Sequence, residues 1–126
     1  MDVLRDSVET AVSLKLFQTR EEASAAHIFN SKLMKLPLSA FQRVDNFNPG
    51  RLQDSAVKAY PLNDRPRGDA DIRAVKFYQK RIQAGAEVDP IWLMKRGKQY
   101  VLLDGAHRIV ALFIERVPFV YAHVVK

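Results

Sequence analysis

The clearest hydrophobic pattern in the chain is helical and lies between Asp71 and Ala84. The apolar positions recur every three or four residues on one face, and they are Ile72, Val75, Tyr78 and Ile82. An aspartate, Asp69 or Asp71, can cap the start, and Gly85 provides a stop signal. The pattern predicts an amphipathic helix over these residues.

The next apolar segments predict a β-hairpin. Ile91–Met94 is almost continuously apolar, and Gln99–Leu103 repeats that character after the polar turn Lys95–Lys98. Two apolar runs joined by a short turn that contains glycine are typical of antiparallel strands. We expect both strands to be buried.

A helix and a last strand are predicted after the hairpin. Asp104-Gly105 interrupts the second apolar run, and Ala106–Glu115 then carries an apolar stripe of helical length. Val117-Pro118 ends that pattern, and Phe119–Val125 reads as a strand.

The first third of the chain has a weaker pattern. Val12, Leu14 and Leu16 alternate with polar residues, which suggests a short strand, although helical spacing before them makes a helical turn equally compatible. Thr19 followed by Glu22 has the form of a capping box, which predicts a short helix that ends before Asn30.

Between these parts the pattern predicts an edge strand and a long connection. Leu33–Phe41 contains Pro37, which cannot donate to an interior ladder, so we expect this strand at a sheet edge. Residues 46–68 are rich in proline, glycine and polar residues, as binding loops often are. The predicted fold class is α+β, a small mixed sheet with helices packed against it, in which residues 1–32 form an extension and residues 33–126 the main domain.

Composition narrows the possible functions. The chain has 126 residues and a net charge of +6. It contains no cysteine, so disulfides, thiolate metal sites and thiol catalysis are excluded. It has neither a run of about 18 apolar residues nor a secretory signal pattern, so we expect a cytoplasmic protein with no membrane partner. The positive charge favours anionic partners, nucleotides or DNA.

The candidate chemistry lies in the turn from Asp104 to Arg108. Gly105 allows a sharp change from strand to helix, and the first N–H groups of a helix form an anion-binding site. His107 and Arg108 in the first turn could bind phosphate oxygens, and Asp104 could bind Mg²⁺ or orient a nucleophile. In the ordinary alternative, Asp104 caps the helix, His107 is a surface residue and Arg108 pairs with a carboxylate.

The chain also resembles a known family, the ParB/sulfiredoxin superfamily. The resemblance runs in order from about Leu33 to the end and is carried by these segments: Leu36-Pro37-Leu38, Arg65-Pro66, Asp89-Pro90-Ile91-Trp92-Leu93, Tyr100 to Arg108 with Ala111, and Val117-Pro118. The resemblance implies that the turn holds the phosphates of a nucleotide, usually ATP with Mg²⁺. It assigns catalysis to Asp104, His107 and Arg108, nucleotide binding to Gly105, Ala106, His107, Arg108, Arg65 and Arg67, and the metal to Asp104.

Members of this family differ in their activity. Sulfiredoxins use a cysteine at the position of Ala106, so this chain is not expected to be one. The short basic form looks most like the plasmid fertility-inhibition branch, which implies Mg²⁺-dependent ATP hydrolysis, DNA phosphodiester cleavage, or both. Two alternatives stay open: a non-catalytic basic inhibitor that acts on DNA or on a protein of a DNA-transfer (conjugation) apparatus, and a small-molecule kinase that acts on a free amino acid.

Two basic clusters are candidate nucleic-acid contacts. Their members are Arg73, Lys76 and Lys80 on the predicted helix and Lys95, Arg96 and Lys98 at the hairpin turn. A solvated helix face is the ordinary interpretation of the first cluster. His27 and His123 have no second metal ligand at useful spacing and are expected to be structural.

Overall fold

A computed structural model describes residues 3–38 and 69–126 of the chain. The described elements are α1 (Val3–Ser13), α2 (Arg20–Phe29), β1 (Ser31–Pro37), α4 (Asp69–Gln83), β2 (Ile91–Arg96), β3 (Gln99–Asp104), α5 (Ala106–Ile114) and β4 (Phe119–Val125). Some predictions lie outside the described residues: the loop 46–68, which contains Arg65 and Arg67, and the last three residues of the predicted edge strand, Ser39, Ala40 and Phe41.

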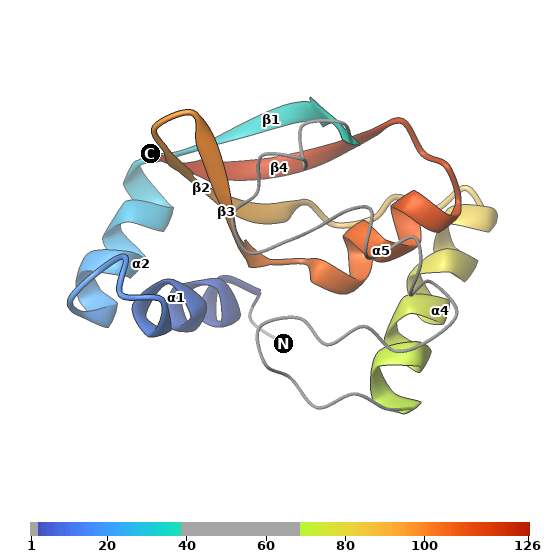
Figure 1. Cartoon of the computed structure of the whole chain (residues 1–126), viewed down its shortest axis with the longest axis horizontal. Coiled ribbons are helices and arrows are strands. Elements are labelled where there is room, and N and C mark those ends of the chain that lie inside the picture. The colour runs from blue at the N-terminus through green and yellow to red at the C-terminus, as the bar shows by residue number, and fades with distance from the viewer. Residues whose placement is uncertain (1–2, 39–68) are drawn as a thin grey trace.

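The four described strands form one mixed sheet with the order β1-β4-β2-β3 (Figure 1). The pairs β1–β4 and β2–β3 are antiparallel, whereas β2 and β4 run parallel. The parallel pair is possible because α5 connects the hairpin to β4. The predicted α+β class, with helices packed against a mixed sheet, is confirmed.

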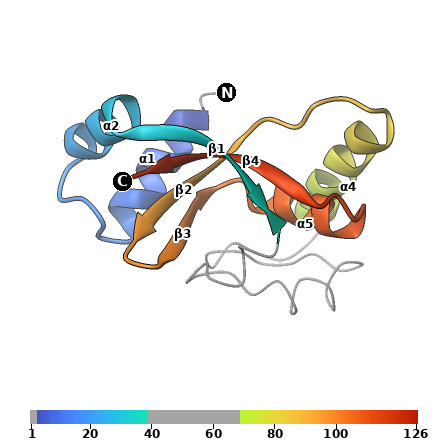
Figure 2. The same cartoon turned by 90° about the horizontal axis from the view of Figure 1, so that it is seen from above.

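Alternate residues of the strands belong to two hydrophobic clusters, one on each face of the sheet. Leu93, Leu102 and Val124 pack with α4 and α5. Their neighbours Val101, Leu103 and Val125 pack instead with α1 and α2. Since successive side chains of a strand point to opposite faces, the helix pairs cover opposite faces of the sheet. Figure 2 shows α1 and α2 at one side of the molecule and α4 and α5 at the other.

The amino-terminal region confirms the helical alternative and not the suggested strand. Residues 3–13 are helical, and Val8 and Ala11 are buried in the cluster with the sheet. The suggested strand at Val12–Leu16 is wrong, because the helix continues to Ser13 and Lys15 then adopts a φ of 61°. The alternation that suggested a strand spans the end of a helix and the turn after it.

The other local predictions agree with the structure. Thr19 Oγ1 accepts a hydrogen bond from the Glu22 N–H at 3.1 Å, which confirms the predicted cap of α2. Strand β1 lies at a sheet edge, as predicted, but it spans Ser31–Pro37, so it begins two residues before the predicted start at Leu33 and does not include Leu38. Helix α4 ends before Gly85, whose φ is 76°.

No helix within residues 3–38 and 69–126 is long and apolar enough to cross a membrane.

Candidate functional site

The junction between β3 and α5 is built on Gly105. Asp104 is the last residue of β3, and α5 begins at Ala106. Gly105 occupies the N-cap with φ 113° and ψ 19°, and no side chain caps the helix there. The first bond of the helix joins the Ile109 N–H to the Gly105 carbonyl at 3.0 Å. The positive end of the α5 dipole therefore begins at the residue that follows the strand.

Gly105 is also fixed by packing against β2. A Cβ atom at this position would lie 2.7 Å from Ile91 Cβ and would collide with Ile91 Cγ2. Ile91 is completely buried, so it has no room to move aside. The close approach and the positive φ both require glycine.

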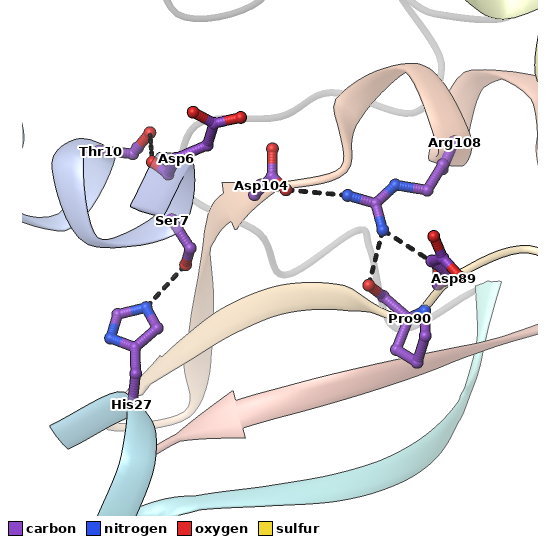
Figure 3. A network of polar contacts seen from close by, with 8 residues as sticks. All are labelled: Asp6, Ser7, Thr10, His27, Asp89, Pro90, Asp104 and Arg108. Carbon is purple, nitrogen blue, oxygen red and sulfur yellow. Dashed lines mark hydrogen bonds and ion pairs between the residues drawn. The ribbon is translucent and has the colours of Figure 1, made fainter. Parts of the chain in front are cut away.

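Arg108 is buried beneath the turn and ties three segments together (Figure 3). One terminal nitrogen, Nη2, donates to Asp104 Oδ2 at 2.9 Å. The other, Nη1, donates to the carbonyls of Asp89 at 3.0 Å and Pro90 at 2.6 Å. The guanidinium thus links the end of β3, the start of α5 and the segment that enters β2.

This arrangement matches the ordinary interpretation of Arg108 as the partner of a carboxylate. Its side chain is only 5% exposed, and that of Asp104 is 14% exposed. The charges of the pair compensate each other, so attraction for an anion at this turn would come from the helix end and from His107. His107 lies in the first turn of α5 and is half-buried.

The carbonyls of Asp89 and Pro90 are parts of the site that reasoning from side-chain chemistry missed. Sequence patterns identify side-chain donors and acceptors, whereas these two residues contribute backbone oxygens. The one signal was the Asp89-Pro90 dipeptide within the segments that carry the family resemblance.

A second polar group lies between α1, α2 and the sheet. His27 is 1% exposed, and its Nδ1–H donates to the Ala23 carbonyl at 2.7 Å. Its Nε2 then accepts from the Ser7 hydroxyl at 2.7 Å (Figure 3). The ring lies 4.8 Å from that of Trp92, whose other neighbour is His123 at 4.5 Å. His27 and His123 are therefore packing residues, as predicted.

Burial affects the titration of both histidines. Desolvation lowers the pKa of His27, and the hydrogen bond to Ala23 opposes this only in part. Desolvation also lowers the pKa of His123. Both rings are thus favoured in the neutral form within the fold.

The two predicted basic clusters lie far apart. Arg73, Lys76 and Lys80 are exposed on α4, and Lys95, Arg96 and Lys98 are exposed at the β2–β3 turn. Figures 1 and 2 both place α4 and this turn at opposite ends of the molecule. The structure does not gather these six cations into one surface.

The described residues hold no group of three or more histidine, cysteine or acidic side chains that could bind a metal ion. Asp104 is the acidic side chain of the turn, and Oδ2 is already bound by Arg108. One carboxylate is nevertheless what Mg²⁺ commonly takes from a protein when phosphates supply its other oxygens. The turn therefore fits a magnesium ion that accompanies a nucleotide and does not fit one held by the protein alone.

A cavity of about 570 Å³ lies beside β4 and the segment 86–90, and Pro90, whose carbonyl accepts from Arg108, is among its lining residues. Among the described residues that line it, Glu87 is the sole charged one. Most of the others are apolar, such as Ile82, Val88, Leu112, Val117 and Val120. This lining does not suit a phosphate chain.

Comparisons with known proteins gave a similarity of fold to solved structures and no match of sequence. No protein-family model and no curated protein matches the sequence. Among solved structures, the chain is similar to a crystal structure of sulfiredoxin from Arabidopsis thaliana, with 19% sequence identity and a TM-score of 0.49. That similarity covers 75% of this chain and 85% of the sulfiredoxin chain.

Proposed function

We propose that this protein binds the phosphates of ATP at the turn Asp104–Arg108 and hydrolyses ATP with Mg²⁺, as an enzyme of the ParB/sulfiredoxin type. The observation that carries the proposal is the start of α5. Its N-cap is a glycine in the left-handed region, with no side-chain cap, directly after a strand. An uncapped helix start of this kind offers backbone N–H groups and a positive dipole end to a phosphate.

The buried pair Asp104–Arg108 gives this turn its rigidity. Because Arg108 binds Asp104 and two carbonyls of the neighbouring segment, the backbone of the turn is held before a ligand arrives. Preorganised donors stabilise the charge that develops on a transferring phosphoryl group without reorganisation during the reaction. Arg108 acts here mainly as a positioning residue.

Three residues of the turn would take the chemical roles. The backbone at Ala106 and His107 would bind phosphate oxygens, and the His107 side chain would donate a hydrogen bond to them. A magnesium ion bound to the phosphates and to Asp104 would neutralise part of their charge. In the hydrolysis, water oxygen forms a bond to the terminal phosphorus, the bond to the ADP oxygen breaks, and the water proton passes to solvent, because Arg108 and the magnesium ion would occupy the two oxygens of Asp104.

Binding and turnover of ATP test this proposal directly. We expect a fluorescent ATP analogue to bind in the presence of Mg²⁺ and inorganic phosphate to be released. His107→Ala should weaken binding by roughly tenfold or more through the loss of one charge-assisted contact. Asp104→Asn should lower turnover, and Lys80→Ala on the exposed face of α4 is the matched control. Equal binding and turnover in all four proteins would remove the turn from the site.

A non-catalytic binding protein is the second candidate, and the burial of Arg108 favours it. A guanidinium engaged by a carboxylate and two carbonyls is not presented to a phosphoryl group in transfer. Nucleotide binding without phosphate release, and without nicking of supercoiled plasmid, would support this candidate. ADP formation that depends on an added free amino acid would support the kinase alternative instead.

A further inference from the structure

One end of the sheet carries an unusual concentration of positive charge. Asp104, at the opposite end of β3, is the only acidic residue within the four described strands. Five exposed cations occupy the end near the β2–β3 turn, and we call them the basic end: Lys32, Lys95, Arg96, Lys98 and Lys126. None of the five has an ion pair among the residues that the structure describes.

The strand register places three of these lysines on one face. In β1, Lys32 lies two positions before Met34, which packs on the α4–α5 cluster. Lys95 in β2 and Lys126, directly after the end of β4, lie two positions after Leu93 and Val124, which are buried in that cluster. Because side chains of a strand alternate, these three lysines extend the same face beyond the part that α4 and α5 cover.

Lys95 and Lys126 directly follow the last register pair of β2 and β4. The parallel register pairs Leu93 with Val124 and Met94 with Val125, so the next positions are Lys95 and Lys126. A hydrogen bond of 3.1 Å from the Lys126 N–H to the Asn30 carbonyl keeps the end of β4 in place. Like charges that follow a strand pair repel each other, and a bound anion would relieve this repulsion.

Exposed apolar side chains adjoin the basic end. The Asn30 carbonyl that binds Lys126 directly follows Phe29, which is 79% exposed, and Ile28, which is 60% exposed. Figure 1 shows the end of α2, the C-terminus and the β2–β3 turn at the same side of the molecule. Helix α2 covers the opposite face of the sheet from the three lysines, but its end adjoins Lys126 at Asn30, so a single strand that passes around this end of the sheet would meet the cations with its phosphates and the ring with a base.

We propose that the basic end binds the phosphate backbone of a single-stranded nucleic acid, with one base stacked on Phe29. This surface is separate from the proposed nucleotide site. The length of β3, from Gln99 to Asp104, separates them by about 17 Å. The exposed cations of α4 take no part.

Fluorescence anisotropy with a labelled oligothymidylate tests this proposal. We expect wild-type protein to bind it. The logarithm of the binding constant should fall linearly with the logarithm of the salt concentration between about 50 and 200 mM. The double variant Lys95→Glu/Lys126→Glu should lose about tenfold or more of this affinity. The matched control, Lys76→Glu/Lys80→Glu, changes the net charge equally on α4 and should retain near wild-type affinity. Equal losses in both double variants would overturn the proposal, as would no binding by the wild type.

Phe29→Ala and a duplex of equal length test the single-strand part. We expect Phe29→Ala to weaken binding several-fold without changing the salt slope, since it removes a stacking contact and no charge. Tighter binding of the duplex, or an unchanged affinity in Phe29→Ala, would overturn the assignment of a single strand. ATP with Mg²⁺ should not displace the oligonucleotide, because the two proposed sites lie at opposite ends of β3. A failure to bind ATP is therefore distinguished from a failure to bind the oligonucleotide. Circular dichroism confirms that each variant is folded.

Discussion

Gly105 and Arg108 hold the same turn by different means. Gly105 allows the chain to pass from β3 into α5 with φ 113° while its backbone touches Ile91. Arg108 then fixes the turn from below through Asp104 and the carbonyls of Asp89 and Pro90. Backbone conformation and a buried charge network therefore determine the shape of the candidate site together.

Gly105→Ala should destabilise the protein by about 3 kcal/mol. The left-handed conformation costs about 1–2 kcal/mol for a residue with a Cβ, and overpacking against Ile91 adds about 1–3 kcal/mol. Gly97→Ala is the matched control, because its φ is 61° but nothing lies within 4 Å of the added Cβ. The control should cost only about 1 kcal/mol in urea unfolding. Equal losses in the two variants would contradict the role of the Ile91 contact.

Arg108→Ala should reduce the free energy of unfolding by about 3–5 kcal/mol, since it leaves Asp104 without its buried partner. Arg20→Ala removes an exposed ion pair with Glu9 and should cost less than about 1 kcal/mol. Thermal and urea denaturation of both variants check this contrast. A loss for Arg108→Ala as small as that for Arg20→Ala would show that the guanidinium does not organise the turn.

At the scale of elements, the two histidines beside Trp92 connect α2 with β2 and β4. Burial lowers the pKa of both His27 and His123 in the folded protein. The unfolded chain therefore binds more protons as the pH falls below the ordinary histidine value of about 6.5. The stability due to the neutral rings is fully present above that value and decreases in acid.

We expect the urea midpoint of unfolding to decrease when the pH is lowered from 7.5 to 5.5. The decrease should be smaller in His123→Phe. Phenylalanine retains a ring against Trp92 but removes one of the two titrating groups. Trp92 is the only tryptophan of the chain, so its fluorescence reports unfolding at this interface. An identical pH dependence in wild type and variant would exclude His123 as a contributor.

The elements that follow from local patterns were predictable, and those set by tertiary contacts were not. The hairpin, α4 and α5 each carry their own periodicity and breakers, so sequence alone located them. The alternation at Val12, Leu14 and Leu16 was misleading, because Leu14 is 40% exposed in the turn after α1. At the site, the glycine turn was predictable. The hydrogen bonds from Arg108 to two carbonyls were not, because they depend on how the segment before β2 packs against α5.

At the scale of the whole molecule, the first two helices complete a three-layer arrangement. Ala11 and Ala23 are fully buried where α1 and α2 pack on the face formed by Val101, Leu103 and Val125. Residues 3–30 thus cover an apolar face that the rest of the described chain leaves open. We expect the helices and the sheet to unfold together.

Ala23→Asp should destabilise the protein by at least about 3 kcal/mol, because it places an unpaired carboxylate in this interface. Ala25→Asp, on the exposed side of the same helix, should cost less than about 1 kcal/mol. Circular dichroism and Trp92 fluorescence should report one coincident transition in both variants. Separate transitions for the two signals would show that α1 and α2 fold independently of the sheet.

Nitrogen–proton correlation NMR of the labelled protein during a titration with ATP and Mg²⁺ tests the central claim most directly. The claim is that phosphate binds at the start of α5, so the amide signals of Ala106 and His107 should shift most and saturate. The amides of Gly97 and Lys98, at the far end of the hairpin, should remain unchanged. Saturable shifts elsewhere, with Ala106 and His107 unaffected, would contradict the account.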